Sequence, residues 1–240
     1  RDDVVDVMTT SPHHSVVGGP GGSRFGWGRG ATFSPVISGL IRTARPKQWV
    51  KNVLVFAAPA AAGVLGQARE FGLTVLAFVA FCFASAAVYF WNDLIDVGAD
   101  RRHPKKGLRP IAAGEVSSTA AWAAAVILPA VALGLAAITG RWQTVGVIGV
   151  YLLINLAYNM GLKRVPVVDL VAVASGFVLR AGAGAVAVDV PMSRWFVLCT
   201  TFGSLFIVAG KRYAELNEVG KGAGTRATLD MYTVGYLRMV

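Results

Sequence analysis

The chain has 240 residues, of which 55% are hydrophobic and 15% charged, and its formal net charge is +10 at pH 7. A soluble domain carries roughly 25% charged residues, so this composition excludes an ordinary soluble domain and indicates a polytopic membrane protein. Positive charge alone would suit nucleic acid, but these cations cluster in loops between long apolar runs, so we expect no nucleic-acid partner. Cys82 and Cys199 fall inside apolar runs, which favours two buried thiols over a disulfide.

Residues 1–34 form no predicted element and are expected to be a flexible N-terminal tail, because residues 18–23 are rich in glycine. They hold no apolar core of about 7–15 residues that would make a signal peptide. Since the chain begins at Arg1 rather than Met, we expect a longer translation product. Residues 35–240 are expected to be one transmembrane catalytic domain that is incomplete at its C-terminal end.

Residues 40–52 predict an amphipathic entry to the membrane. Trp49 and the neighbouring cations suit the level of the lipid headgroups, and Lys47 is interpreted as an interfacial anchor. Lys51 and Asn52 stand at the mouth of the first apolar run, so both are candidate ligand-binding residues.

Six apolar segments predict spanning helices, and a seventh is expected to begin near residue 229 and to be cut off at Val240. The expected limits of the six are about 50–66, 71–91, 117–138, 143–162, 166–188 and 193–210. No glycine-rich βαβ unit or alternating barrel pattern competes with this interpretation. The expected fold class is therefore all-α, a polytopic membrane helical bundle with at least seven spans.

The cations orient the predicted bundle. With the N-terminus in the cytoplasm, the inner segments hold fifteen Lys and Arg residues and the outer segments hold three. The inner cations are Arg42, Arg45, Lys47, Lys51, Arg101, Arg102, Lys105, Lys106, Arg109, Lys163, Arg164, Lys211, Arg212, Lys221 and Arg226. This asymmetry follows the positive-inside rule and predicts a multi-pass protein of the plasma (inner) membrane whose active site faces the cytoplasm.

Acidic residues gather where the second apolar run ends. Asp93, Asp96 and Asp100 are spaced i, i+3 and i+7, so a continuous helix would place them on one face, with Asn92 at its edge. Their oxygens are hard ligands that suit Mg²⁺. Five basic residues follow and would suit a polyanion: Arg101, Arg102, Lys105, Lys106 and Arg109. The alternative is a solvated helix end, but carboxylates are costly in a membrane helix, which favours a functional site.

The fifth apolar run carries two charges. Asp169 and Arg180 are eleven residues apart and would project from nearly the same side of a helix, roughly 16 Å apart. A charge at mid-membrane costs at least about 2.5–3.5 kcal/mol, so Arg180 is expected to face a polar cavity or a partner. An ion pair and an anion-binding role are both open for it.

Further polar residues close the fourth and sixth runs on the inner side. Tyr158 and Lys163 end the fourth run, and Lys211, Tyr213 and Glu215 end the sixth. Lys211 and Glu215 are spaced i, i+4, so a plain helix salt bridge is one interpretation. Because several inner segments supply polar groups to the same membrane face, the other interpretation is a pocket for a ligand with several phosphates.

These motifs resemble a known family. The sequence Asn92-Asp93-x-x-Asp96-x-x-x-Asp100 is similar to the first aspartate-rich motif of the UbiA superfamily of intramembrane prenyltransferases. Five blocks resemble one branch of it, the decaprenyl-phosphate phosphoribosyltransferases: RPKQWVKN at 45–52, DRRHPKKGLRPIAAG at 100–114, GLK at 161–163, SGFVLR at 175–180, and GSLF with GKRYAEL between 203 and 216. Taken together, the likeness covers about residues 40–240.

The resemblance implies an activity and roles for residues. Such enzymes transfer 5-phosphoribose from phosphoribosyl pyrophosphate to decaprenyl or another polyprenyl phosphate, release pyrophosphate, and supply cell-wall arabinan synthesis. The Mg²⁺-diphosphate role would fall on Asp93 and Asp96, with Asn92 and Asp100 in support. The phosphate-binding cations would fall among Lys51, Arg101, Lys106, Arg109, Lys163, Arg180 and Lys211.

One departure from the wider superfamily is informative. Ordinary prenyltransferases carry a second aspartate motif at the sixth span, where residues 211–215 here read KRYAE. This weakens the case for the nearest alternative, an aromatic prenyltransferase that makes a quinone precursor. An alternative of another class is a transporter or lipid-binding protein that uses the polar cavity for passage. An assembly of several copies is also left open.

Overall fold

The structure, a computed structural model, describes residues 35–219, and every regular element in that range is a helix. Contacts divide the chain into residues 1–32 and 33–240, and all described residues belong to the second unit. Its elements are α1 (Pro35–Ala44), η1 (Pro46–Phe56), α2 (Ala57–Ala61), η2 (Val64–Gly66), α3 (Ala68–Ile95), α4 (Val97–Asp100), η3 (Lys106–Leu108), α5 (Ser118–Ile138), α6 (Trp142–Met160), η4 (Leu162–Arg164), α7 (Val168–Ala187) and α8 (Arg194–Val219). The all-α prediction is confirmed. The predicted tail and the predicted seventh span lie outside the described residues.

Four helices are long and apolar enough to cross a membrane: α3, α5, α6 and α7. They match the predicted runs 71–91, 117–138, 143–162 and 166–188. The sixth predicted run lies within α8, which has 26 residues and is not among those four. Cys82 is buried as expected, whereas Cys199 on α8 is exposed.

The first predicted run, 50–66, is not one regular α-helix. The segment consists instead of the 3₁₀ helix η1, the five-residue α2 and the three-residue η2. Pro59 lacks the N–H that a helix interior needs, and Gly63 adopts a positive φ of 70° between α2 and η2. This irregular backbone brings Asn52 and Val55 into the interior, both fully buried.

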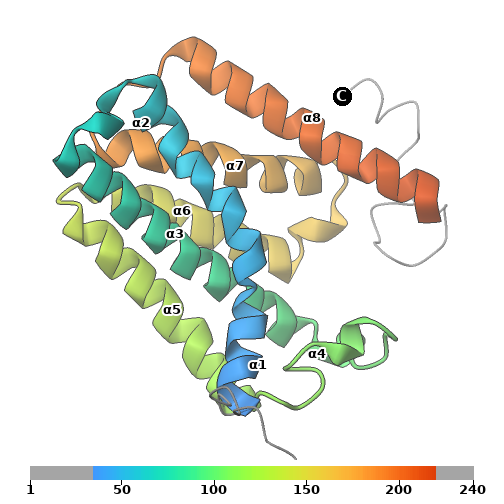
Figure 1. Cartoon of the computed structure of the whole chain (residues 1–240). Coiled ribbons are helices and arrows are strands. Elements are labelled where there is room, and N and C mark those ends of the chain that lie inside the picture. Colours follow the sequence, from blue (N-terminus) through green and yellow to red (C-terminus); the bar gives the residue numbers. More distant parts are fainter. Residues whose placement is uncertain (1–34, 220–240) are drawn as a thin grey trace, which may run out of the picture. The chain divides into compact units, whose positions relative to one another are not determined.

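The helix α3 is the centre of the bundle, in contact with α1, η1, α5, α6 and α7. Figure 1 shows α5 and α6 beside it, with α7 beyond α6 and α8 along α7. Small residues let these helices approach closely: Ala77, Ala80, Ala84 and Ala87 of α3 are all fully buried. The same core cluster contains Phe81, Ile148 and Tyr151, so aromatic rings fill the space that the alanines leave.

Candidate active site

The carboxylate of Asp93 lies near the end of α3 and is almost completely buried, with 2% of its surface exposed. Its Oδ1 accepts hydrogen bonds from Arg45 Nη2 at 2.7 Å, Arg109 Nη1 at 3.1 Å and Asn92 Nδ2 at 3.3 Å. Two guanidinium groups therefore compensate the buried charge, as a buried carboxylate requires.

The other two aspartates have different partners. Asp100 Oδ2 accepts a hydrogen bond from Arg109 Nη1 at 2.6 Å, so Arg109 joins Asp93 to Asp100. Asp96 is held by Lys163, whose Nζ lies 2.7 and 2.9 Å from the two carboxylate oxygens. The helix α3 ends at Ile95 and α4 begins at Val97, so the continuous helix that would place all three acids on one face is interrupted at Asp96.

Sequence reasoning counted Arg45 as an inner cation and as the start of a resembling block, but did not select it as a site residue and missed its contact with Asp93. Arg45 adopts a left-handed conformation with φ 52° between α1 and η1. Its guanidinium lies 4.7 Å from the centre of the Tyr89 ring, a cation–π contact. Two signals in the sequence could have selected it: its place directly before Pro46, where a helix is expected to end, and its place in the block RPKQWVKN.

A second polar cluster surrounds Arg180 of α7. Its Nε donates to Asn52 Oδ1 at 2.8 Å, its Nη1 to the Gly176 carbonyl at 2.6 Å and its Nη2 to the Tyr151 hydroxyl at 3.0 Å. The Tyr151 ring centre lies 4.9 Å from the guanidinium carbon. Ser85 Oγ is within reach of Asn52 Oδ1 at 3.2 Å and Tyr151 Oη at 3.4 Å, so η1, α3, α6 and α7 share one network.

All of these partners of Arg180 are neutral. Among residues 35–219, no carboxylate forms a salt bridge with Arg180, which is only 8% exposed. Asp169, the candidate for an ion pair with it, is paired instead with Arg212 of α8, whose Nε lies 3.4 Å from Asp169 Oδ2. Sequence reasoning did not select Arg212. A buried guanidinium without a counter-charge favours the anion-binding interpretation.

Two lysines add to the positive charge near Arg180. Lys51 of η1 lies outside the four spanning helices and is half-buried. Burial lowers the pKa of its ammonium, and the positive charges of Lys211 and Arg180 lower it further. Within the described part of the chain, neither lysine forms a salt bridge with a carboxylate. The three cations together create a positive field that an anion would relieve.

The remaining predicted residues lie around these two clusters. Glu215 pairs with Arg212 at 3.2 Å, not with the predicted Lys211, and Tyr213 packs with Leu170 and Leu216. Arg101 is exposed and donates to the Ala112 carbonyl at 3.3 Å. The loop residue Lys106 and the α6 residue Tyr158 are half-buried.

The carboxylates do not form a ready-made metal cage. Across residues 35–219, no group of three or more His, Cys, Asp or Glu side chains could hold a metal ion by itself. The donors at the end of α3 are nevertheless all oxygens, from two separate carboxylates and the Asn92 amide. Such a set suits a hard cation that takes its other ligands from phosphate and water.

Residues 53–215 match the model of the UbiA prenyltransferase family. The chain belongs to this family. The matched range includes both clusters apart from Arg45, Lys51 and Asn52, which precede it.

Curated relatives within the UbiA family are similar over most of the chain. A decaprenyl-phosphate phosphoribosyltransferase of Corynebacterium glutamicum is 49% identical over 206 residues, which are 84% of this chain and 62% of that protein. Proteins of the same name from Mycolicibacterium smegmatis and Mycobacterium tuberculosis are 46% and 47% identical over 85% of this chain and cover 66% and 69% of their own lengths. The chain therefore spans about two thirds of the length of these relatives.

Solved structures agree with the UbiA fold. A UbiA homologue of Archaeoglobus fulgidus, bound to DMAPP and Mg²⁺, has a TM-score of 0.66 with this chain at 21% identity. The match covers 80% of this chain and 67% of that one. At this identity the likeness shows the fold alone.

Proposed function

We propose that this chain catalyses the transfer of 5-phosphoribose from phosphoribosyl pyrophosphate to a polyprenyl phosphate, with release of pyrophosphate. The observation that carries the proposal is the presence of two separate charged clusters. One combines acids with cations at the end of α3, and the other has Arg180, Lys51 and Lys211 without any salt-bridged carboxylate among the described residues. A reaction between a sugar diphosphate and an anionic lipid needs both. The curated relatives have the name of this activity.

The acidic cluster is assigned to the diphosphate. Asp93, Asp96 and Asn92 would hold Mg²⁺ through oxygen atoms, with phosphate and water as its other ligands. When bound, the metal supplies positive charge that makes pyrophosphate a better leaving group. Three cations that are hydrogen-bonded to these carboxylates would also bind the diphosphate oxygens: Arg45, Arg109 and Lys163.

The second cluster is assigned to another phosphate of the reacting pair, on the lipid or on the ribose. Arg180 presents a guanidinium fixed by Asn52 and Tyr151, so little conformational entropy is lost when an anion binds. Lys51 and Lys211 add charge without a rigid geometry. Lys211, at the position of the second aspartate motif, fits a substrate with an additional phosphate.

The reaction itself is proposed to be a dissociative substitution at the anomeric carbon. As pyrophosphate leaves, the ribose develops oxocarbenium character, as in glycosyl transfer generally. The lipid phosphate is already an anion near neutral pH, so no general base is needed. Attack opposite to the leaving group predicts inversion at this carbon. Catalysis would then depend mainly on orientation, which can contribute about 7–11 kcal/mol, and on charge stabilisation.

The proposal includes a place in the cell. The predicted excess of inner cations puts the acidic end of α3 on the cytoplasmic face of the plasma membrane, where phosphorylated sugars are available. The lipid acceptor would reach the site from the bilayer. The product would serve cell-wall arabinan synthesis, as the resemblance implies.

One assay tests the function. Membranes containing the protein are incubated with phosphoribosyl pyrophosphate labelled in the ribose, polyprenyl phosphate and Mg²⁺, and we expect a labelled lipid. Labelled prenyl diphosphate with an aromatic acceptor forms the comparison arm. Product in that arm alone would identify an aromatic prenyltransferase, and recovery of unchanged ligand across the membrane would identify a transporter. Either result would contradict the proposal.

A further inference from the structure

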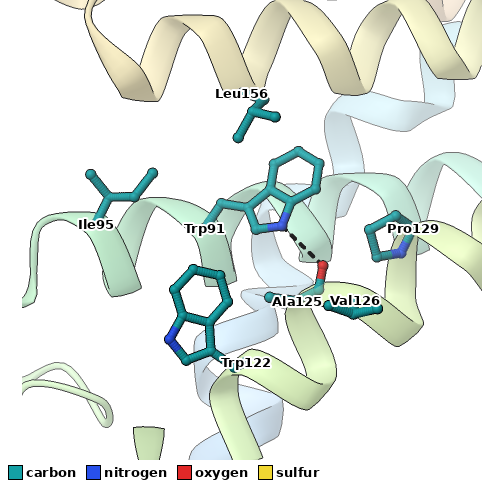
Figure 2. Close-up of a pocket in the computed structure, with 7 residues that line it drawn as sticks. All are labelled: Trp91, Ile95, Trp122, Ala125, Val126, Pro129 and Leu156. Carbon is teal, nitrogen blue, oxygen red and sulfur yellow. Dashed lines mark hydrogen bonds between the residues drawn. The ribbon is translucent and has the colours of Figure 1, made fainter. Parts of the chain in front are cut away.

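An apolar groove lies outside the two charged clusters, between α3, α5 and α6. It has a volume of about 410 Å³ and is lined by Trp91, Ile95, Trp122, Ala125, Val126, Pro129 and Leu156. Figure 2 shows the indole of Trp91 in the middle, with Trp122 of α5 on one side of it and Leu156 of α6 on the other. The volume lies within the range of about 300–1,000 Å³ that is usual for small-molecule sites.

The walls of the groove are fixed by one hydrogen bond. Pro129 lies inside α5 and has no N–H to donate to the carbonyl four residues earlier, which belongs to Ala125. Trp91 Nε1 donates to this carbonyl at 2.9 Å, as the dashed line in Figure 2 shows. The proline therefore creates a free acceptor, and the indole of the neighbouring helix satisfies it. Trp91 is held in one orientation, so the groove is preformed.

The groove ends beside the acidic cluster. Ile95 lines it, and the next residue, Asp96, is the one bound to Lys163. Leu156 of α6 also lines it, seven residues before Lys163 of η4. The ion pair between Asp96 and Lys163 thus joins the segments that directly follow α3 and α6, two of the three helices that form the groove. A chain lying in the groove would reach the candidate active site at this end.

We propose that this groove binds the isoprenoid chain of the lipid acceptor close to its phosphate. The inference rests on the proposed function for the identity of the lipid. An apolar chain fits because the lining contains no charged side chain, and because the groove lies on helices able to cross a membrane. Lys163 binds Asp96, the residue that follows Ile95 of the groove, so the lipid phosphate would arrive at the diphosphate side of the site.

Physical chemistry limits what such a groove does. Inside a bilayer the surrounding lipid is as apolar as the groove, so transfer from water contributes nothing and only packing and shape discriminate. We therefore expect the phosphate to supply most of the affinity. The groove directs the chain and selects a methyl-branched chain that packs against the fixed ring of Trp91 over a mobile acyl chain.

The first experiment is photolabelling of the whole protein in membranes. The probe is a polyprenyl phosphate with a diazirine in an isoprene unit close to the phosphate, and labelled peptides are mapped by mass spectrometry. We expect labels on α5 near Trp122 and Val126, displaced by unmodified polyprenyl phosphate but not by phosphatidylglycerol. Labels on another surface, or equal displacement by phosphatidylglycerol, would overturn the inference.

The second experiment fills the groove. Val126 lines it and is 68% exposed, whereas the next residue, Ile127, is 58% exposed and does not line it. Val126→Trp should raise the KM for polyprenyl phosphate about three- to tenfold, with the KM for phosphoribosyl pyrophosphate unchanged, because only packing is lost. Ile127→Trp should change neither constant. An unchanged lipid KM in Val126→Trp would contradict the groove assignment.

The two proposals fail separately. If the protein transfers no phosphoribose at all, the photolabelling still reports where a polyprenyl phosphate lies. If transfer occurs but the label falls elsewhere, the proposed function stands and the groove assignment is wrong. If the Val126→Trp variant does not accumulate in membranes, the photolabelling of the unmodified protein decides whether the groove binds the isoprenoid chain.

Discussion

Lys163 donates to both carboxylate oxygens of Asp96, at 2.7 and 2.9 Å, and so connects η4 to the end of α3. The two side chains are 23% and 31% exposed, so a soluble substrate can reach the pair. Lys163→Ala should raise the KM for phosphoribosyl pyrophosphate about tenfold or more, since a hydrogen bond to a charged group contributes about 1.5–3 kcal/mol. Lys163→Arg should restore part of the loss. Unchanged KM values for both substrates would contradict the role of Lys163.

Substitutions of the candidate metal-site aspartates should affect turnover, whereas substitution of an aspartate that only forms a surface ion pair should not. Asp93→Ala and Asp96→Ala should each abolish turnover, by about a thousandfold or more, because both the metal and the orientation of the diphosphate are lost. The amount of protein in the membrane should not change. The control is Asp189→Ala: this residue is 70% exposed and pairs with Arg141 at 2.7 Å, away from both clusters. Near-normal activity of Asp93→Ala or of Asp96→Ala would contradict the assignment of these residues to the metal.

Arg180 should matter for activity and little for stability. If it is replaced, Asn52 and Tyr151 still have Ser85 within hydrogen-bonding distance, so no buried partner is left without a bond. Arg180→Met removes the desolvation cost of a buried charge without a counter-ion, which offsets the lost hydrogen bonds, so the free energy of unfolding should change by no more than about 1 kcal/mol. Turnover should be lost. Thermal unfolding in detergent and the transfer assay measure the two effects. Strong destabilisation would indicate a structural role, and retained turnover would exclude the anion-binding role.

For Arg212 we expect the opposite of Arg180: a large effect on stability and little effect on activity. It is 3% exposed and pairs with the fully buried Asp169, so Arg212→Met leaves a buried carboxylate with a weakened charge balance. The expected loss of unfolding free energy is about 3–5 kcal/mol, and replacing both residues with apolar ones should recover much of it. Arg42 and Glu115 are a matched control: this pair lies 2.8 Å apart but is 51% and 39% exposed. Its removal should cost no more than about 1 kcal/mol. Equal losses of unfolding free energy in the two pairs would show that burial does not determine how much an ion pair contributes to stability.

The hydrogen bond between Trp91 and Ala125 can be measured by a double-mutant cycle. Trp91→Phe removes the indole donor and should cost about 1 kcal/mol. Pro129→Ala supplies a helix N–H to the same carbonyl, so Trp91→Phe should cost less in that background, with a coupling of about 0.5–1 kcal/mol. Thermal unfolding of the four proteins gives the values. Additive losses would show that the indole does not replace the missing helix bond.

Much of the fold was predictable because apolar runs of spanning length leave few alternatives. The runs that became α3, α5, α6 and α7 were located to within a few residues. The first run was not, because its apolar content did not reveal the irregular backbone around Pro59 and Gly63. The resulting 3₁₀ segment of eleven residues is much longer than the usual three or four.

The candidate site was predictable in its residue types and less so in its partners. Arg180 and the aspartates stood out because charges are rare in apolar runs. Sequence spacing could not show that Asp96 ends a helix, and so it predicted one acidic face. It also could not show that Asp169 meets Arg212 and not Arg180, because that choice depends on how α7 packs against α8.

A methyl group placed on Gly184 would overlap the backbone carbonyl of Val55. The backbones of α7 and η1 therefore contact each other directly at this point, with no side chain between them that could adjust the spacing. Even an alanine at position 184 would push η1 away from α7 and move Asn52 away from the Arg180 guanidinium. The alignment of Asn52 with Arg180, in the candidate anion-binding cluster, thus depends on a hydrogen atom at Gly184, four residues from this arginine.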